Sequence, residues 1–331
     1  MNSPIFVIGS NSFSGASFVK YLLQMGHAVI GCSRSEQPID ALLPYKLQTG
    51  TLTNFSFFQY DINSNLDLIE RLIDKYKPSY IYNFAAQSMV GQSWDYPEHW
   101  FMTNTVSTVK LHNILRKKDF IDRYIHISTP EVYGSCSGFV DESQALNPST
   151  PYAVSRAAAD MSLKTFFNVH QFPYVATRAA NVYGAGQQLY RIIPKTILSI
   201  LQGDSLQLHG GGLSERSFIH IDDVCNATYK IGVDGELGHT YHISTNRVIS
   251  IKYLVKTICS MMGADYGQLC QVTEDRAGKD AAYLLDSGKL RESLNWSEQI
   301  SLENGLESTI SWLSQNFSDL KRQPSIYIHK V

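Results

Sequence analysis

The side chains best suited to chemistry stand in two short parts of this chain. The run Ile127–Gly134 follows an apolar, strand-like segment and contains a hydroxyl at Thr129 and a carboxylate at Glu131. Further along, Tyr152 and Arg156 are four residues apart, a spacing that places two side chains on one face of a helix. A neighbouring cation stabilises a phenolate, so we expect a lowered pKa for the tyrosine. Such a tyrosine can take a proton from a sugar hydroxyl while a hydride leaves the same carbon. Plain helix packing also produces this spacing, so the rest of the chain must support the interpretation.

The first residues predict a βαβ unit that would bind a nucleotide. Ile5–Ile8 is an apolar, strand-like run, Ser14–Met25 has apolar residues at helical spacing, and Ala28–Cys32 is typical of a second buried strand. The turn between the first strand and the helix, Gly9–Gly15, carries glycines that let the backbone approach a pyrophosphate at the helix N-terminus.

Strand and helix patterns alternate along the first half of the chain, which predicts a parallel, doubly wound sheet. Further strands are expected at Phe55–Tyr60, Tyr80–Phe84, Tyr124–Ile127 and Tyr174–Thr177, and helices at Leu66–Lys75, Glu98–Arg116, Tyr152–Asn168, Ile192–Leu201 and Leu302–Gln315. Ligands bind such sheets at the carboxyl ends of the strands. The segments Gly9–Gly15, Asp61-Ile62, Ala85–Ser88 and Ser128–Glu131 each follow a strand, so we expect them to meet in one cleft.

Composition excludes several other classes of protein. The 331 residues are 44% hydrophobic and 18% charged with a net charge of -2, which does not favour a nucleic-acid partner. No apolar run is long enough for a bilayer, and we expect neither a signal peptide nor a membrane partner. Five cysteines without a CxxC pair predict reduced thiols and a cytoplasmic location. The ten histidines show no metal-ligand spacing, so no metal site is expected.

Several motifs together make the chain resemble the extended short-chain dehydrogenase/reductases that act on nucleotide sugars. Within that superfamily it is most similar to the nucleotide-sugar 4,6-dehydratases that act on dTDP-glucose or GDP-mannose. The resemblance covers nearly the whole chain and is carried by Val7–Gly15, Tyr82–Ser88, Ser128–Gly134, Tyr152–Arg156, Arg178–Gly184, Ile193-Pro194, Arg216–Val224 and Asp275–Asp280.

This resemblance implies an α/β fold, with a Rossmann-type doubly wound parallel sheet and a smaller C-terminal α/β substrate domain. It implies an NAD(P)-binding domain over residues 1–180, to which residues of about 217–245 return, and a nucleotide-sugar-binding domain over 181–331. The implied partners are a nucleoside-diphosphate hexose and a second copy of the chain. In the homodimer, the helices predicted at Glu98–Arg116 and Tyr152–Asn168 would form a four-helix interface.

The resemblance also implies the residues of the site. The catalytic group would be Thr129, Glu131, Tyr152 and Arg156. Cofactor contacts are expected at Gly9, Asn11, Ser12, Phe13, Ser14, Gly15, Arg34, Asp61, Ile62, Phe84, Ala85, Ala86, Gln87, Asn104, Ile127, Ser128, Tyr152, Arg156, Ala179, Asn181 and Val182. Substrate contacts are expected at Gln87, Ser88, Thr129, Pro130, Glu131, Asn181, Arg191, Ile192, Lys195, Arg216, Arg276 and Asp280.

Four positions depart from the family pattern or bear on the choice of cofactor. Ser12 stands where the family's glycine turn usually has a glycine, and Arg156 replaces the catalytic lysine. Arginine keeps the positive charge but is effectively never deprotonated. Pro130 stands where thymidine-linked dehydratases have an aspartate and guanosine-linked ones a serine. Arg34, after the second strand, is placed to meet a 2′-phosphate, which favours NADP over NAD as the tightly bound cofactor.

The reaction that the resemblance implies has three steps. Tyr152 removes the C4 hydroxyl proton as the hydride leaves C4, Glu131 abstracts the acidified C5 proton, and water leaves from C6 before the hydride returns there. A nucleotide-sugar epimerase or decarboxylase on the same scaffold is one alternative. A catalytically weak protein that binds cofactor or nucleotide sugar is another, which the replacements at Pro130 and Arg156 keep open.

Overall fold

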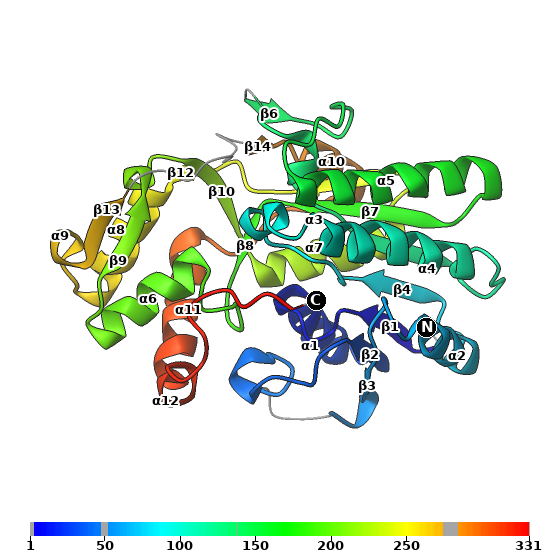
Figure 1. The fold of residues 1–331 in the computed structure, drawn as a ribbon, viewed down its shortest axis with the longest axis horizontal. Helices are drawn as coiled ribbons and strands as arrows, with labels where there is room; N and C mark the ends of the chain where they lie inside the picture. Colours follow the sequence, from blue (N-terminus) through cyan, green and yellow to red (C-terminus); the bar gives the residue numbers. More distant parts are fainter. Residues whose placement is uncertain (1–2, 48–51, 137, 274–283, 331) are drawn as a thin grey trace.

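The computed structural model describes residues 3–47, 52–136, 138–273 and 284–330. Its centre is a sheet of seven parallel strands in the order β11-β7-β5-β4-β1-β2-β3 (Figure 1). The strands are β1 (Ile5–Ile8), β2 (Val29–Ser33), β3 (Phe55–Gln59), β4 (Tyr80–Asn83), β5 (Arg123–Ile127), β7 (Tyr174–Ala179) and β11 (Thr240–Ile243). The strand order reverses between β1 and β4, which is where doubly wound sheets open a ligand crevice. The predicted α/β fold with a doubly wound sheet is confirmed.

Helices cover both faces of this sheet. On one face lie α1 (Phe13–Gln24), α7 (Ile221–Asp234) and α10 (Gly288–Leu294), and on the other α2 (Leu66–Tyr76), α4 (Thr108–Leu115) and α5 (Pro151–His170). In β1, Ile5 and Val7 belong to the first core, whereas Phe6 and Ile8 belong to the second. Because neighbouring strand residues face opposite sides, a strand covered by helices on both sides is apolar throughout.

The helix predicted over Glu98–Arg116 is helical but not uniform. It begins as α3 (Pro97–Phe101), continues as a π-helical stretch at Met102–Ser107 and ends as α4. π-helical turns inside helices are frequent at functional sites. Here the stretch buries Asn104 completely, next to the loop that follows β4.

Of three further short sheets, two build a smaller lobe, and the third, a strand pair that contains Val140 and Leu285, packs against α5 (Figure 1). A mixed sheet contains β8 (Asn181–Tyr183), β10 (Glu215–His220) and β12 (Val248–Ser250), and the strand pairs are β9 (Leu206–His209) with β13 (Cys270–Thr273) and β6 (Phe139–Val140) with β14 (Leu284–Leu285). The helices are α6 (Ile192–Gln202), α8 (Ile251–Met262), α9 (Tyr266–Leu269), α11 (Leu302–Gln315) and α12 (Phe317–Leu320). Tyr183, Ile193, Leu254, Leu306 and Trp312 belong to a core of this lobe, separate from the cores of the large sheet.

The chain passes between the two lobes more than once. After β10 it forms α7 and β11, and β11 pairs with β7 at the edge of the large sheet. After α12 it runs back from the small lobe and ends beside α1 (Figure 1). In the described ranges, no helix combines the length and the apolar character needed to cross a bilayer.

Candidate active site

The glycine turn after β1 is tightly folded against the loop after β4. Gly9 has φ +82°, and a Cβ there would lie 2.6 Å from the backbone nitrogen of Ala85. A Cβ on Gly15 would lie 2.2 Å from the carbonyl oxygen of Gly9. Both positions therefore require glycine, and they bring the backbone close to any ligand lying at the N-terminus of α1, as a dinucleotide site needs.

Ser12, the departure from the family's glycine, caps the first helix. Its Oγ accepts a hydrogen bond from the backbone N–H of Gly15 at 3.0 Å and donates one to the carbonyl of Gly9 at 2.7 Å. A serine at this N-cap position satisfies an otherwise unpaired helix amide. The turn thus keeps its shape without the glycine.

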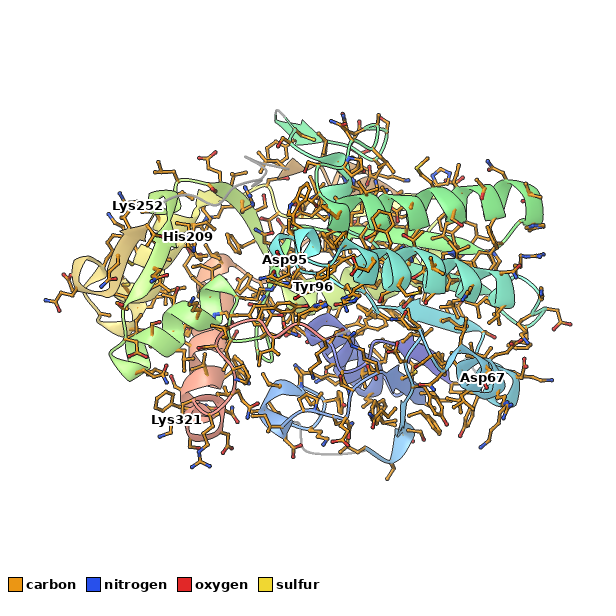
Figure 2. All side chains as sticks on the ribbon, viewed as in Figure 1. Asp67, Asp95, Tyr96, His209, Lys252 and Lys321 are labelled. Atoms are coloured by element: carbon orange, nitrogen blue, oxygen red, sulfur yellow. The ribbon has the colours of Figure 1, made fainter. Side chains whose placement is uncertain are left out.

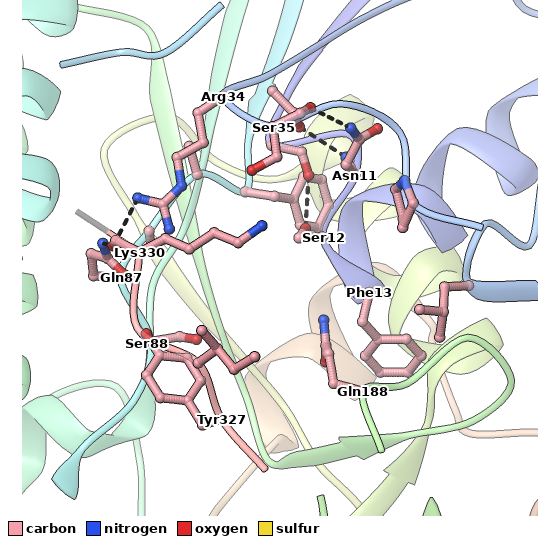
Figure 3. Close-up of a pocket in the computed structure, with 18 of the residues that line it drawn as sticks. Asn11, Ser12, Phe13, Arg34, Ser35, Gln87, Ser88, Gln188, Tyr327 and Lys330 are labelled. Atoms are coloured by element: carbon pink, nitrogen blue, oxygen red, sulfur yellow. Dashed lines mark hydrogen bonds between the residues drawn. The ribbon is translucent and has the colours of Figure 1, made fainter. Parts of the chain in front are cut away.

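Asn11 joins the glycine turn to the loop after β2. Its backbone N–H donates to Ser33 Oγ at 2.9 Å, and its side-chain amide donates to the carbonyl of Ser35 at 2.9 Å (Figure 3). Arg34, between these two serines, is held beside the turn. The Arg34 guanidinium donates to the carbonyl oxygen of Lys330 at 3.2 Å.

A cavity of about 550 Å³ opens between these loops. The predicted cofactor or substrate residues that line it are Gly9, Asn11, Ser12, Phe13, Arg34, Asp61, Ile62, Phe84, Ala85, Ala86, Gln87 and Ser88. Three of the four segments predicted to converge therefore do so, at the carboxyl ends of β1, β3 and β4. Sequence reasoning missed other residues that line this cavity, among them Glu36, Gln188, Tyr190, Gln323, Pro324, Ile326, Tyr327, Ile328 and Lys330. Glu36 and Tyr190 stand beside the predicted contacts Arg34 and Arg191, whereas no motif in the sequence indicated a ligand near Gln323–Lys330.

Asn104 lies beneath the cavity. Its side chain accepts a hydrogen bond from the Gln87 backbone N–H at 2.8 Å and donates to the Gln87 carbonyl and to Ser155 Oγ, each at 3.0 Å. Asn104 is fully buried, so its amide holds the loop after β4 against α5. Asn104 therefore fixes the position of Gln87, which lines the cavity.

The fourth segment, after β5, carries the predicted catalytic hydroxyl and carboxylate. Thr129 caps a short helical turn, Pro130–Tyr133, and its Oγ1 accepts from the backbone N–H of Glu131 at 3.3 Å. Pro130 is buried at the first position of this turn, where its fixed φ suits the helical geometry. It therefore shapes the turn and supplies no acid.

Tyr152 and Arg156 stand on the first turns of α5, and both are buried. Burial raises the pKa of Tyr152 above its ordinary value, although Arg156 and a hydrogen bond with Thr129 oppose this. The expected lowering of the tyrosine pKa is thus wrong, because desolvation penalises the phenolate more than the cation stabilises it. Arg156 also donates to the carbonyl of Ile127, which ties α5 to β5.

A buried polar network supports the catalytic turn from behind. Ser128 Oγ donates to Asp160 Oδ2 at 2.7 Å, and Arg178 donates to the same oxygen at 2.7 Å. Burial opposes ionisation of Asp160, but Arg178 and His126 outweigh it and hold the pKa of this carboxyl well below its ordinary value. The Ser128 hydroxyl, predicted to contact the cofactor, is thus engaged away from the cavity.

The predicted substrate residues come from several elements of the small lobe. Asn181, on β8, is the register partner of Phe218 on β10, and Arg216 precedes Phe218 by two residues. Arg191 stands at the start of α6, and its charge acts on Tyr152, which places it near the catalytic tyrosine. Ile192 and Lys195 lie in the first turns of α6, and Ala179 and Val182 lie on β7 and β8. Arg276 and Asp280 fall outside the described residues.

In the part of the chain that is described, no three histidine, cysteine, aspartate or glutamate side chains are placed to hold a metal ion.

Comparison with known proteins identifies the family. The model of the family "GDP-mannose 4,6 dehydratase" matches residues 6–309. The chain therefore belongs to the GDP-mannose 4,6-dehydratase family. The prediction of an extended short-chain dehydrogenase/reductase related to the nucleotide-sugar 4,6-dehydratases is confirmed.

Two curated relatives illustrate the range of similarity. The dTDP-glucose 4,6-dehydratase of Neisseria gonorrhoeae is 29% identical over 340 residues, covering 94% of this chain and 96% of the relative. A trifunctional UDP-glucose 4,6-dehydratase, epimerase and reductase of Arabidopsis thaliana is 34% identical over 268 residues. That alignment covers 80% of this chain, which spans only 40% of the plant protein.

Solved structures show the same fold. The dTDP-glucose 4,6-dehydratase of Streptomyces venezuelae, solved with NAD, has a TM-score of 0.88 at 29% identity, covering 95% of this chain and 98% of the other. The dTDP-glucose 4,6-dehydratase of Bacillus anthracis, also solved with NAD, has a TM-score of 0.86 at 28% identity, with 96% and 99% covered. A UDP-glucose 4-epimerase of Thermotoga maritima, solved with UDP-glucose, is more distant, with a TM-score of 0.84 at 25% identity over 95% and 99% of the two chains.

Proposed function

We propose that this protein is a nucleotide-sugar 4,6-dehydratase that converts a nucleoside-diphosphate hexose to the 4-keto-6-deoxy sugar. The observation that carries the proposal is the position of the Glu131 carboxylate, two residues after Thr129. The Thr129 side chain is hydrogen-bonded with Tyr152, so the carboxylate lies in the same turn as a partner of the tyrosine. A simple 4-epimerase needs the tyrosine and the cation but no base for C5. The glutamate therefore favours dehydration over epimerisation.

Each catalytic side chain has one task in this proposal. Tyr152 takes the proton of the C4 hydroxyl, Thr129 holds that hydroxyl, and Arg156 supplies the fixed charge beside the phenolate. Glu131 takes the C5 proton after C4 has become a ketone and passes it to the C6 hydroxyl, which leaves as water; C5 regains a proton when the hydride is returned to C6. The nicotinamide cofactor, when bound, accepts the hydride from C4 and returns it to C6. The tight glycine turn and the cavity beside it fit this group.

The test of the function is mass spectrometry after incubation with NDP-hexoses that differ in base and sugar. We expect one substrate to lose a single water, with no net consumption of NAD or NADP. Interconversion of two hexoses without a change in mass would indicate an epimerase. Loss of carbon dioxide from a nucleotide uronic acid would indicate a decarboxylase. If the protein binds cofactor but turns over no nucleotide sugar, it is a binding protein.

The preference for NADP is a proposal that rests on Arg34, and the solved relatives named above contain NAD. We expect Arg34→Ala to weaken NADP binding more than NAD binding, by about tenfold, because only NADP carries the 2′-phosphate that a guanidinium binds. Isothermal titration with both dinucleotides measures the difference. Glu36→Gln is the matched variant in the same cavity. If Glu36→Gln weakens the binding of NAD but not of NADP, and Arg34→Ala weakens the binding of both cofactors equally, the site prefers NAD.

We also propose a homodimer formed through α3, α4 and α5. Met102 and Val106 on the π-helical stretch and Val154 and Met161 on α5 expose 47%, 38%, 38% and 62% of their surfaces. Apolar side chains gathered on two long helices are typical of an interface. We expect the mass of a dimer by static light scattering at micromolar concentration, and a shift to monomer in Met161→Glu. A monomeric parent protein would contradict the proposal.

A further inference from the structure

The 323–330 segment, from Gln323 to Lys330, crosses the carboxyl edge of the large sheet and is held there by aromatic rings. The His329 ring stacks on those of Tyr96, His99 and Trp100, with centroids 5.3, 5.1 and 5.0 Å away. His329 Nε2 also lies 2.8 Å from His99 Nδ1. Tyr327 packs edge-on against Tyr190, with centroids 5.6 Å apart. The segment is thus packed against the start of α3 and the loop before α6.

The end of the segment is also bonded to the walls of the cavity. The carbonyl oxygen of Lys330 accepts hydrogen bonds from Gln87 Nε2 at 2.8 Å and from Arg34 Nη1 at 3.2 Å (Figure 3). These donors come from the loops after β4 and β2, on either side of the glycine turn. The segment therefore joins two walls of the dinucleotide cavity.

Side chains alternate along the segment as they do in an extended strand. Tyr327 and His329 are partly buried against the protein, whereas Ile326, Ile328 and Lys330 are exposed. The two isoleucines expose 68% and 57% of their surfaces and line the cavity. The cavity of about 550 Å³ remains with the segment in place, so the segment forms a wall and does not fill the space.

The Lys330 side chain reaches into the cavity. Figure 3 shows its ammonium end pointing across the cavity toward Ser12, at the N-terminus of α1. Among the described residues, no carboxylate forms an ion pair with Lys330. Its positive charge therefore faces the same space as the amides of the glycine turn, which is where a diphosphate would gain from both.

We propose that the 323–330 segment is a binding wall of the dinucleotide site, in which the Lys330 ammonium binds the cofactor diphosphate and Ile326 and Ile328 cover its adenosine half. This inference rests on the proposed function, because it takes the cavity to be the cofactor site. Covering the two isoleucines with ligand removes their apolar surface from water, in addition to the apolar surface that Phe13 and Phe84 offer on the opposite walls. The wall therefore adds to the retention of the cofactor between turnovers.

The experiment is calorimetric titration of NAD and NADP into the cofactor-depleted full chain. Lys330→Gln is expected to weaken both dinucleotides about tenfold, the loss of one charge-assisted hydrogen bond. The same variant is expected to weaken ADP but leave adenosine binding unchanged, because adenosine has no phosphate. His329→Ala, which removes the ring that fastens the segment, is expected to speed NADH dissociation in stopped-flow fluorescence. Lys321→Gln is the matched control, since this exposed lysine lies at the outer edge of the molecule, away from Tyr96 (Figure 2).

The outcomes separate this inference from the proposed function. If the parent protein binds neither dinucleotide, the proposed function fails and the inference with it. If the parent binds but Lys330→Gln and His329→Ala bind and release the cofactor as the parent does, the segment is no part of the site. Tighter binding in His329→Ala would show that the segment obstructs the cavity, which also overturns the inference. An equal loss for ADP and adenosine would overturn the diphosphate contact.

Discussion

Tyr152→Phe is expected to lower the rate of C4 oxidation by about 10²–10⁴-fold, the usual contribution of a positioned general base. The phenol lies at the start of α5, where it is hydrogen-bonded with Thr129 and interacts electrostatically with Arg156. Phenylalanine preserves the ring in this buried position. The measurement is single-turnover absorbance of the reduced nicotinamide after addition of the substrate. Cofactor affinity, measured alongside, should stay within a few-fold of the parent.

The cation beside this tyrosine gives a sharper test. Only the deprotonated tyrosine accepts the C4 proton, so the rate rises with pH through the pKa of Tyr152. Burial already raises that pKa, and Arg156 opposes the rise. Removing the charge in Arg156→Met should therefore raise the pKa further and move the alkaline rise of activity upward by about 1–3 pH units.

Arg156→Lys is the matched variant, because it keeps the charge that Arg156→Met removes. It should retain most of the activity and the pH profile of the parent, although its shorter side chain gives up the bond to the Ile127 carbonyl. An unchanged profile in Arg156→Met would show that Arg156 only ties α5 to β5. The protein would then be better described as a catalytically weak binder of cofactor and nucleotide sugar.

Glu131→Gln is expected to stop dehydration at the second step. Glutamine preserves the size of the side chain in the turn after Thr129 but has no useful basicity, so the C5 proton stays in place. Oxidation at C4 does not need Glu131. The variant should therefore accumulate reduced nicotinamide and form the dehydrated product about 10²-fold or more slowly than the parent.

Solvent-deuterium incorporation at C5, followed by mass spectrometry in heavy water, measures this step directly. Glu307→Gln, at an exposed position on α11, is the control for a general loss of a carboxylate. Incorporation at the parental rate in Glu131→Gln would remove the glutamate from the mechanism. It would also take away the observation that separates the proposed dehydratase from an epimerase.

The sequence by itself determined the parts of this protein that depend on local chemistry. A strand covered by helices on both faces must be apolar throughout, so Ile5–Ile8 could be recognised without a structure. Gly9 and Gly15 could be assigned to a tight turn because only glycine fits where a Cβ would meet backbone atoms. The convergence of the loops after β1, β3 and β4 followed from the parallel order of the strands, which places all carboxyl ends at one edge.

Only the tertiary structure decided what depends on burial and on contacts between distant residues. The spacing of Tyr152 and Arg156 indicated a nearby charge, but it held no information about desolvation, which reverses the net effect on the tyrosine pKa. Hydrogen-bond partners of Ser128 and Asn104 come from another element, α5. The sequence therefore could not predict that the side chains of Ser128 and Asn104 bond there and do not line the cavity. The position of Lys330 depends on bonds to Arg34 and Gln87, 296 and 243 residues earlier in the chain. Such contacts arise from the packing of the whole fold, and no local pattern encodes them.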